Sequence, residues 1–362
     1  MECTDFIRSH VHPMQPYAPG LREEQVRAIA GTDELVKVSS NESPFPPFDS
    51  AQEAGARALS GLNRYPDGGS HELKEALSQR LGIAPQNLVI GNGSNELLIL
   101  LAYATVGSGD QIVYGWPSFI VYPLMCQLTG AEAVEVPLDD GAGFDLDAIL
   151  QAITPATQMV ILCNPNNPTG TRYTREAFEA FMEQVPEDVL VVVDEAYFEF
   201  VVDECYPNAL DWFDGQRALC VLRTFSKIYS MAGARCGYGI MPEPLIVALD
   251  KVRAPFNVNS VAQEMAIASL ADEAELTKRI LVNAEQRDRL QEALDRIGFR
   301  YVSSHTNFIW IMVDDAQKMF DALLKKGIIA RSFGLGNALR IGVGSPDEVT
   351  CTIAALEELT SV

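Results

Sequence analysis

Lys227 and Arg235 interrupt a largely apolar stretch of this sequence. Residues 218–239 read ALCVLRTFSKIYSMAGARCGYG, with Lys227 just after a strand-like run and Arg235 eight residues further on. A buried ammonium is costly to desolvate unless it is paired or loses its proton, so a lysine in such a place often takes part in chemistry. The alternative is that Lys227 lies at a strand end and reaches solvent. The residues at the other strand ends distinguish these interpretations.

Polar residues also follow two other apolar runs. Asp194 ends the run VLVVVD, and Tyr197 lies three residues later. A buried carboxylate is expensive unless it meets a cation, so a purely structural role for Asp194 carries less weight. After QMVILC comes NPNNPTG, in which Asn167 precedes Pro168. This segment is either a proline-rich turn or a rigid frame for an amide that donates hydrogen bonds.

A glycine turn follows the run NLVI. It reads GNGSNELLILLAYA, so that Ser94 and Asn95 open an apolar helix. The free N–H groups and the positive dipole end of such a helix suit a phosphate. Glu96 stands where a dinucleotide-binding G-x-G-x-x-G motif has its third glycine, which disfavours a dinucleotide. A tight strand-to-helix turn without a ligand accounts for the same residues about as well.

An aromatic residue and two hydroxyls complete the set. Phe119 follows QIVYG and could stack on a flat ring or pack in the core, while Thr224 and Ser226 precede Lys227. The strand ends thus hold a phosphate cradle, a ring, an amide, a carboxylate, a phenol and a lysine. Pyridoxal 5'-phosphate uses all of them, because its aldehyde reacts with a lysine amine and its pyridine nitrogen meets an acid.

The elements that would position these residues form an α/β pattern. Short apolar runs without in-out alternation are separated by helical patterns, as expected when helices cover both faces of a mostly parallel sheet. The runs are NLVIG, QIVYG, AVEVPL, QMVILC, DVLVVVDE, ALCVLRT and GYGIM. They predict a large domain on a mostly parallel seven-stranded sheet, with a ligand site at the carboxyl ends of its strands.

The pattern changes after residue 241. Residues 261–297 are charged and helical, and FRYVSS, NFIWIMV, IIARSF and ALRIGVG then read as strands between helices. We expect a large domain over residues 36–244, a smaller C-terminal α/β domain over 245–362, and an N-terminal segment, 1–35, that packs with the small domain.

Composition excludes several classes of function. The 362 residues include 49 acidic and 27 basic side chains, a net charge of −22 that repels nucleic acid and anionic membranes. The seven cysteines form no C-x-x-C pair, and the four histidines have no metal-ligand spacing, so no metal site is expected. Neither a secretory signal nor an apolar run of about 20 residues is visible, which favours a cytoplasmic protein.

The sequence resembles the fold-type I aminotransferases of class II over essentially its full length, and among them the histidinol-phosphate aminotransferase family. The motifs that carry the resemblance are PYAPG from residue 16, SSNESP from 39, RYPDG from 64, GNGSNEL from 91, NPNNPTG from 164, VVVDEAYFEF from 191, TFSKIYSMAGARCGY from 224, KVRAPFNVN from 251 and LRIGVG from 339. The resemblance implies pyridoxal 5'-phosphate as cofactor. It also implies a homodimer with shared active sites.

The resemblance assigns a role to each candidate. Lys227 would bond to the cofactor aldehyde and then move the proton of the substrate carbon, while Asp194 would keep the pyridine nitrogen protonated. Tyr197 and Asn167 would bind the ring oxygen, and Phe119 would stack on the ring. The cofactor phosphate would be held by Ser94, Asn95, Thr224, Ser226, Arg235 and, from the neighbouring subunit, Tyr65.

The implied reaction is transamination of L-histidinol phosphate with 2-oxoglutarate, giving imidazole acetol phosphate and glutamate, a step of histidine biosynthesis. Arg340 matches the arginine for a substrate carboxylate or phosphate, and Arg331 and Tyr17 match positions that contact the phosphate of the substrate. Asn167 would also contact the substrate. Phe256 occupies a position near the imidazole where some relatives carry tyrosine.

Three alternatives share much of this set of residues. An aromatic amino-acid aminotransferase would use Arg340 and leave Arg331 idle. A lyase related to threonine-phosphate decarboxylase would release carbon dioxide. A ligand-sensing domain of a transcription factor is disfavoured by the negative charge and by the lack of a DNA-binding extension.

Overall fold

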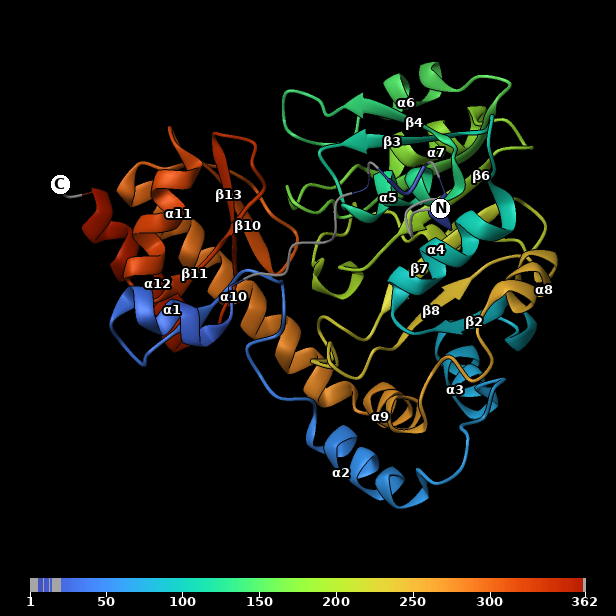
Figure 1. Ribbon diagram of the computed structural model, residues 1–362, viewed down its shortest axis with the longest axis horizontal. Coiled ribbons are helices and arrows are strands. Elements are labelled where there is room, and N and C mark those ends of the chain that lie inside the picture. Colours follow the sequence, from blue (N-terminus) through green and yellow to red (C-terminus); the bar gives the residue numbers. More distant parts are fainter. Residues whose placement is uncertain (1–5, 9, 13, 15–20, 361–362) are drawn as a thin grey trace.

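A seven-stranded sheet forms the centre of the larger part of the molecule (Figure 1). The computed structural model describes residues 6–8, 10–12, 14 and 21–360. Strand β8 runs antiparallel to its two neighbours and the other pairs are parallel. The order across the sheet is β2 (Leu88–Gly91), β8 (Gly237–Ile240), β7 (Leu219–Thr224), β6 (Leu190–Asp194), β5 (Thr157–Cys163), β3 (Gln111–Trp116), β4 (Glu132–Pro137). Each predicted run is a strand of this sheet, and the predicted α/β fold is confirmed.

Helices cover the sheet closely enough to bury whole strands. Every residue of β6 and β7 is buried, which explains why these runs show no alternation of apolar and polar side chains. In the large part of the molecule α4 packs against α5 and α8, α6 packs against α7, and α9 packs against α2 and α3. These helices are α2 (Asp49–Ala58), α3 (His71–Leu81), α4 (Ser94–Thr105), α5 (Val121–Thr129), α6 (Leu146–Ala152), α7 (Arg175–Gln184), α8 (Glu243–Val252) and α9 (Ser260–Ala271).

A smaller antiparallel sheet lies at the other end of the molecule (Figure 1). Its order is β12 (Arg331–Ser332), β13 (Ala338–Gly342), β10 (Phe308–Met312), β9 (Arg300–Val302). Helices α10 (Glu273–Ile297), α11 (Ala316–Lys325) and α12 (Pro346–Thr360) pack around it. None of the helices in the described ranges has the length and apolar character required to span a membrane.

The run IIARSF forms two strands instead of the single predicted one. Its first half is β11 (Ile328–Ile329), which pairs in parallel with β1 (Val36–Lys37), and its second half is β12. Helix α1 (Glu23–Ala30) packs against α11. Residues 23–37 therefore lie with the C-terminal elements, as Figure 1 shows. The domain boundaries at residues 35 and 244 stay a prediction.

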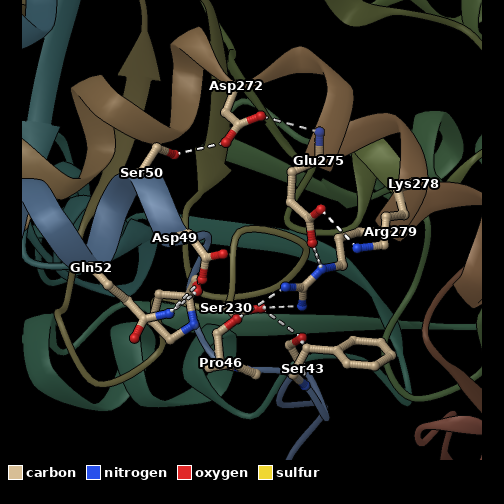
Figure 2. Close-up of polar contacts among 12 residues, drawn as sticks. Ser43, Pro46, Asp49, Ser50, Gln52, Ser230, Asp272, Glu275, Lys278 and Arg279 are labelled. Atoms are coloured by element: carbon tan, nitrogen blue, oxygen red, sulfur yellow. Dashed lines mark hydrogen bonds and ion pairs between the residues drawn. The ribbon is translucent and has the colours of Figure 1, made fainter.

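Helix α10 connects the two parts of the molecule and begins in a polar network (Figure 2). Asp272 follows the last residue of α9 and caps α10, because its carboxylate accepts a hydrogen bond from the backbone N–H of Glu275. The predicted helical stretch 261–297 is therefore divided into two helices at Asp272. Arg279 pairs with Glu275 at 2.6 Å and donates to the carbonyl of Pro46 at 3.3 Å. It also donates to Ser230 Oγ at 3.5 Å. Helix α10 thereby contacts the loop that follows Lys227.

Candidate active site

A cavity of about 470 Å³ opens at the carboxyl ends of the parallel strands, where the small sheet approaches the large one. Its walls include most of the candidates from the sequence. These are Ser94, Asn95, Phe119, Asn167, Asp194, Tyr197, Thr224, Ser226, Lys227, Arg235, Arg331 and Arg340. Residues that are far apart along the chain therefore meet in one place, as the rule for open α/β sheets predicts.

One corner of the cavity is built to receive an anion. Ser94 is the first residue of α4, and Gly93 before it has a φ of 83°, which glycine adopts without strain. A Cβ atom at Gly93 would collide with the guanidinium of Arg235, and one at Gly237 would collide with the backbone N of Ser94. The two glycines thus let the helix N-terminus, its free N–H groups and Arg235 come together.

Hydroxyl groups line the same corner. Thr224 Oγ1 donates to Ser226 Oγ at 3.0 Å, and Arg235 Nη1 donates to Ser226 Oγ at 3.3 Å. Arg235 also donates to the carbonyls of Ala232 and Asn92, at 3.0 and 3.3 Å. These contacts fix the guanidinium beside the N-terminus of α4. The corner has the charge and the donors that a phosphate group requires.

Lys227 lies on the floor of the cavity. Its Nζ donates to the carbonyl of Ser40 at 3.4 Å and lies 5.6 Å from the centre of the Tyr197 ring. Burial lowers the pKa of Lys227 to about 8, and repulsion from Arg340 contributes in the same direction. The lowered pKa raises the fraction of this lysine that is a neutral amine, the nucleophilic form, near neutral pH.

Asp194 ends β6 beneath the cavity and is almost completely buried, with 3% of its surface exposed. Its Oδ2 accepts from the hydroxyl of Tyr122 at 2.9 Å, and its Oδ1 accepts from the backbone N–H of Ala196 at 3.3 Å. Burial raises the pKa of Asp194 to about 6. Such a carboxylate is stabilised by a cationic partner, and a protonated ring nitrogen supplies one.

The two predicted substrate arginines are neighbours across a strand pair. Arg331 on β12 lies opposite Arg340 on β13. Arg340 is 5% exposed, donates to Asn167 Oδ1 at 2.5 Å, and also donates to the carbonyl of Ser39. The ring of Phe333 lies 5.1 Å from the Arg340 guanidinium and 5.9 Å from that of Arg331. Like charges opposite one another are unfavourable, so this wall of the cavity favours an anionic ligand.

Some residues of the site were missed in the sequence. The hydroxyl of Tyr197 accepts from Asn41 Nδ2 at 2.8 Å, and the carbonyl of Asn41 accepts from Asn307 at 3.0 Å. Asn41 has a φ of 54° and lies in the motif SSNESP, which was noted only for the resemblance. Tyr122 had a weaker signal, a phenol three residues after Phe119 in an apolar helix.

Two predicted residues, Tyr65 and Phe256, lie outside this cavity. Tyr65 and Phe256 stack on each other with ring centres 4.6 Å apart, and neither lines the cavity. The Tyr65 side chain is 82% exposed, so its hydroxyl is free to reach another molecule. Tyr17 is outside the described residues.

The cavity fits pyridoxal 5'-phosphate. An anion corner, a buried lysine with a lowered pKa and a buried carboxylate stand around a space that Phe119 helps to line. The sequence profile of aminotransferase class I and II matches residues 33–356. The chain belongs to this family.

Two relatives within the family align with nearly the whole of this chain. It is 42% identical over 363 residues to a histidinol-phosphate aminotransferase of Moorella thermoacetica, covering 99% of this chain and 93% of the relative. It is 39% identical over 358 residues to an aromatic amino acid aminotransferase of Streptomyces coelicolor, covering 99% and 98%. Because the two sequence identities are similar, the substrate has to be inferred from the residues of the site.

A solved structure has the same fold. Histidinol-phosphate aminotransferase from Sinorhizobium meliloti in complex with pyridoxal-5'-phosphate superposes with a TM-score of 0.90 at 30% identity, over 98% of each chain. The predicted family, fold class and type of enzyme are confirmed. The roles of individual residues stay predictions.

Proposed function

We propose that this aminotransferase uses pyridoxal 5'-phosphate to transfer an amino group between L-histidinol phosphate and 2-oxoglutarate. The opposed pair Arg331 and Arg340 supports this substrate most directly. A phosphate monoester carries close to two negative charges at neutral pH and has three oxygens that accept hydrogen bonds from guanidinium groups. A single carboxylate offers two guanidinium groups less charge and fewer acceptor oxygens than a phosphate does.

The cofactor supplies an aldehyde that reacts with amines and a pyridinium ring that accepts electrons from the substrate carbon. Ser94, Ser226 and Arg235 hold its phosphate at the N-terminus of α4. Asp194 holds the proton of its ring nitrogen. Lys227 would be the amine that meets its aldehyde and would then hold and return the proton of the substrate carbon, a role that suits an amine with a pKa of about 8.

Removing the guanidinium of Arg331 should separate the two kinds of substrate. In the Arg331→Ala variant, KM for histidinol phosphate should rise about 10- to 100-fold, since hydrogen bonds to a charged group are lost. Turnover of phenylalanine and tyrosine should change little. Half-reactions with histidinol phosphate, phenylalanine, tyrosine and threonine phosphate measure this.

The matched control is Arg300→Ala, which removes an exposed arginine from the same small sheet. It should leave all rates as they are. Equal rates for phenylalanine and histidinol phosphate in the unmodified enzyme would contradict the proposal. Carbon dioxide release from threonine phosphate would instead support a lyase.

Transamination of aromatic amino acids is the second candidate. The ring of Phe333, which lines the cavity, lies 5.1 Å from the Arg340 guanidinium, so an aromatic side chain would meet apolar surface beside a carboxylate partner. In that case Arg331 has no role in binding. The substrate panel distinguishes the candidates directly.

We also propose a homodimer in which Tyr65 completes the phosphate corner of the partner's site. The exposure of Tyr65 and its absence from the cavity of its own chain support this arrangement. It is tested by mixing two defective proteins, Lys227→Ala and Tyr65→Ala, at limiting cofactor. A hybrid dimer then contains one site with neither change, and activity should recover to about a quarter of the unmodified level.

Each variant incubated alone is the control for this mixing experiment. The mass of the protein in solution reports the oligomeric state independently. A mixture no more active than the Tyr65→Ala protein it contains would mean that Tyr65 does not serve a second subunit.

A further inference from the structure

Tyr122 contacts two of the residues expected to hold the cofactor ring. It lies on α5, is completely buried, and donates its hydroxyl hydrogen to Asp194 Oδ2 at 2.9 Å. Its ring and that of Phe119 make an edge-to-face contact, with ring centres 5.9 Å apart and planes at 84°. Phe119 precedes Tyr122 by three residues, so one turn of chain sets the positions of both contacts.

The surroundings of Tyr122 keep its hydroxyl protonated, so that it remains a hydrogen-bond donor. Burial and the neighbouring Asp194 raise the pKa of Tyr122 well above its ordinary value, so the phenol keeps its proton. The bond to Tyr122 opposes the effect of burial on Asp194, because it favours the charged form of the carboxylate. Among the described residues, the other titratable groups that interact with this carboxylate include Glu195, Lys227, Tyr197, Cys163 and Cys220.

Of these groups, Lys227 favours the ionised carboxylate and Glu195 opposes it. The charge of Glu195 is compensated separately by Arg223, at 2.7 Å. The effect of Lys227 on the carboxylate is lost when the lysine amine gives up its proton. Tyr122 therefore supplies a contact to the ionised carboxylate that does not depend on the state of the lysine.

We propose that Tyr122 is a positioning residue that holds the Asp194 carboxylate ionised and oriented for contact with the ring nitrogen of the cofactor. The proposal rests on the cofactor site described above. It assigns to Tyr122 an effect on the proton of the cofactor nitrogen, which is separate from its contribution to packing.

The test compares Tyr122→Phe with Tyr114→Phe in the holoenzyme. Tyr114 is equally buried and packs against Tyr122, but its hydroxyl bonds to Glu135 at 3.2 Å. Tyr122→Phe should weaken cofactor binding about tenfold in equilibrium dialysis, because a hydrogen bond to a charge is lost. It should also move the midpoint of the pH titration of the visible absorbance upward by about half a unit, since the ring carries less positive charge.

In steady-state assays, kcat of the Tyr122→Phe enzyme should fall with little change in KM, while Tyr114→Phe should match the unmodified enzyme. In an Asp194→Asn background the Tyr122→Phe change should have no further effect on cofactor binding. Equal effects of the two tyrosine changes, or an unmoved absorbance midpoint, would reduce Tyr122 to a packing residue. Failure of the cofactor assignment itself would be distinct, because the unmodified protein would then show no such absorbance.

Discussion

The Lys227→Ala variant is expected to lose its yellow colour and nearly all of its turnover. The absorbance near the visible edge depends on the bond between the lysine amine and the cofactor aldehyde, and alanine cannot form it. Proton transfer by a positioned base is worth about 10²- to 10⁴-fold in rate, and the covalent step adds to that. Absorption spectra and steady-state rates measure both losses.

The phosphate corner is separate from the lysine amine, so the Lys227→Ala protein should still bind the cofactor noncovalently in equilibrium dialysis. This retention shows that the loss is chemical and that the fold is intact. Lys251→Ala is the control, because Lys251 is an exposed lysine on α8. If colour and turnover both survived in Lys227→Ala, the assignment of the cofactor site would be wrong.

The strand ends were predictable because burial of a parallel sheet leaves a simple pattern. Strands covered on both faces are largely apolar, so a charged residue at their carboxyl end stands out, as Asp194 does at the last position of β6. Lys227 and Arg235 stand out in the same way after β7. Residues that take part in chemistry at such positions can therefore be recognised from the sequence alone.

Contacts between distant residues were not visible in that way. Asn41 reaches Tyr197 across 156 positions of sequence, and Tyr122 reaches Asp194 across 72. The juxtaposition of Arg331 with Arg340 depends on the register of β12 against β13, and the predicted single strand at IIARSF concealed where β12 begins. Local pattern gives the elements, whereas register and packing decide which side chains meet.

Replacing Asp194 with asparagine should lower the turnover of the holoenzyme but raise the stability of the apoprotein. Without the carboxylate, the proton on the cofactor nitrogen loses its partner, and kcat should fall on the order of 10²- to 10³-fold, as for other preorganised electrostatic contacts. The apoprotein should instead become more stable at pH 8, by about 3 kcal/mol, because a buried charge is removed. Denaturant unfolding of the apoprotein between pH 4 and 8 measures the second effect.

The sign follows from the pKa of Asp194, which is about 6 in the folded protein against an ordinary value of 3.8. Below pH 3.8 the group is protonated in both states, so the Asp194→Asn variant and the unmodified apoprotein should be equally stable. Between these pH values the unfolded chain releases the proton first, and the unmodified apoprotein loses stability until pH 6 is passed. Asp188→Asn, an exposed change before the other end of β6, should show no such trend. A variant less stable than the unmodified apoprotein at pH 8 would mean that Tyr122 and the backbone N–H of Ala196 already compensate the buried charge.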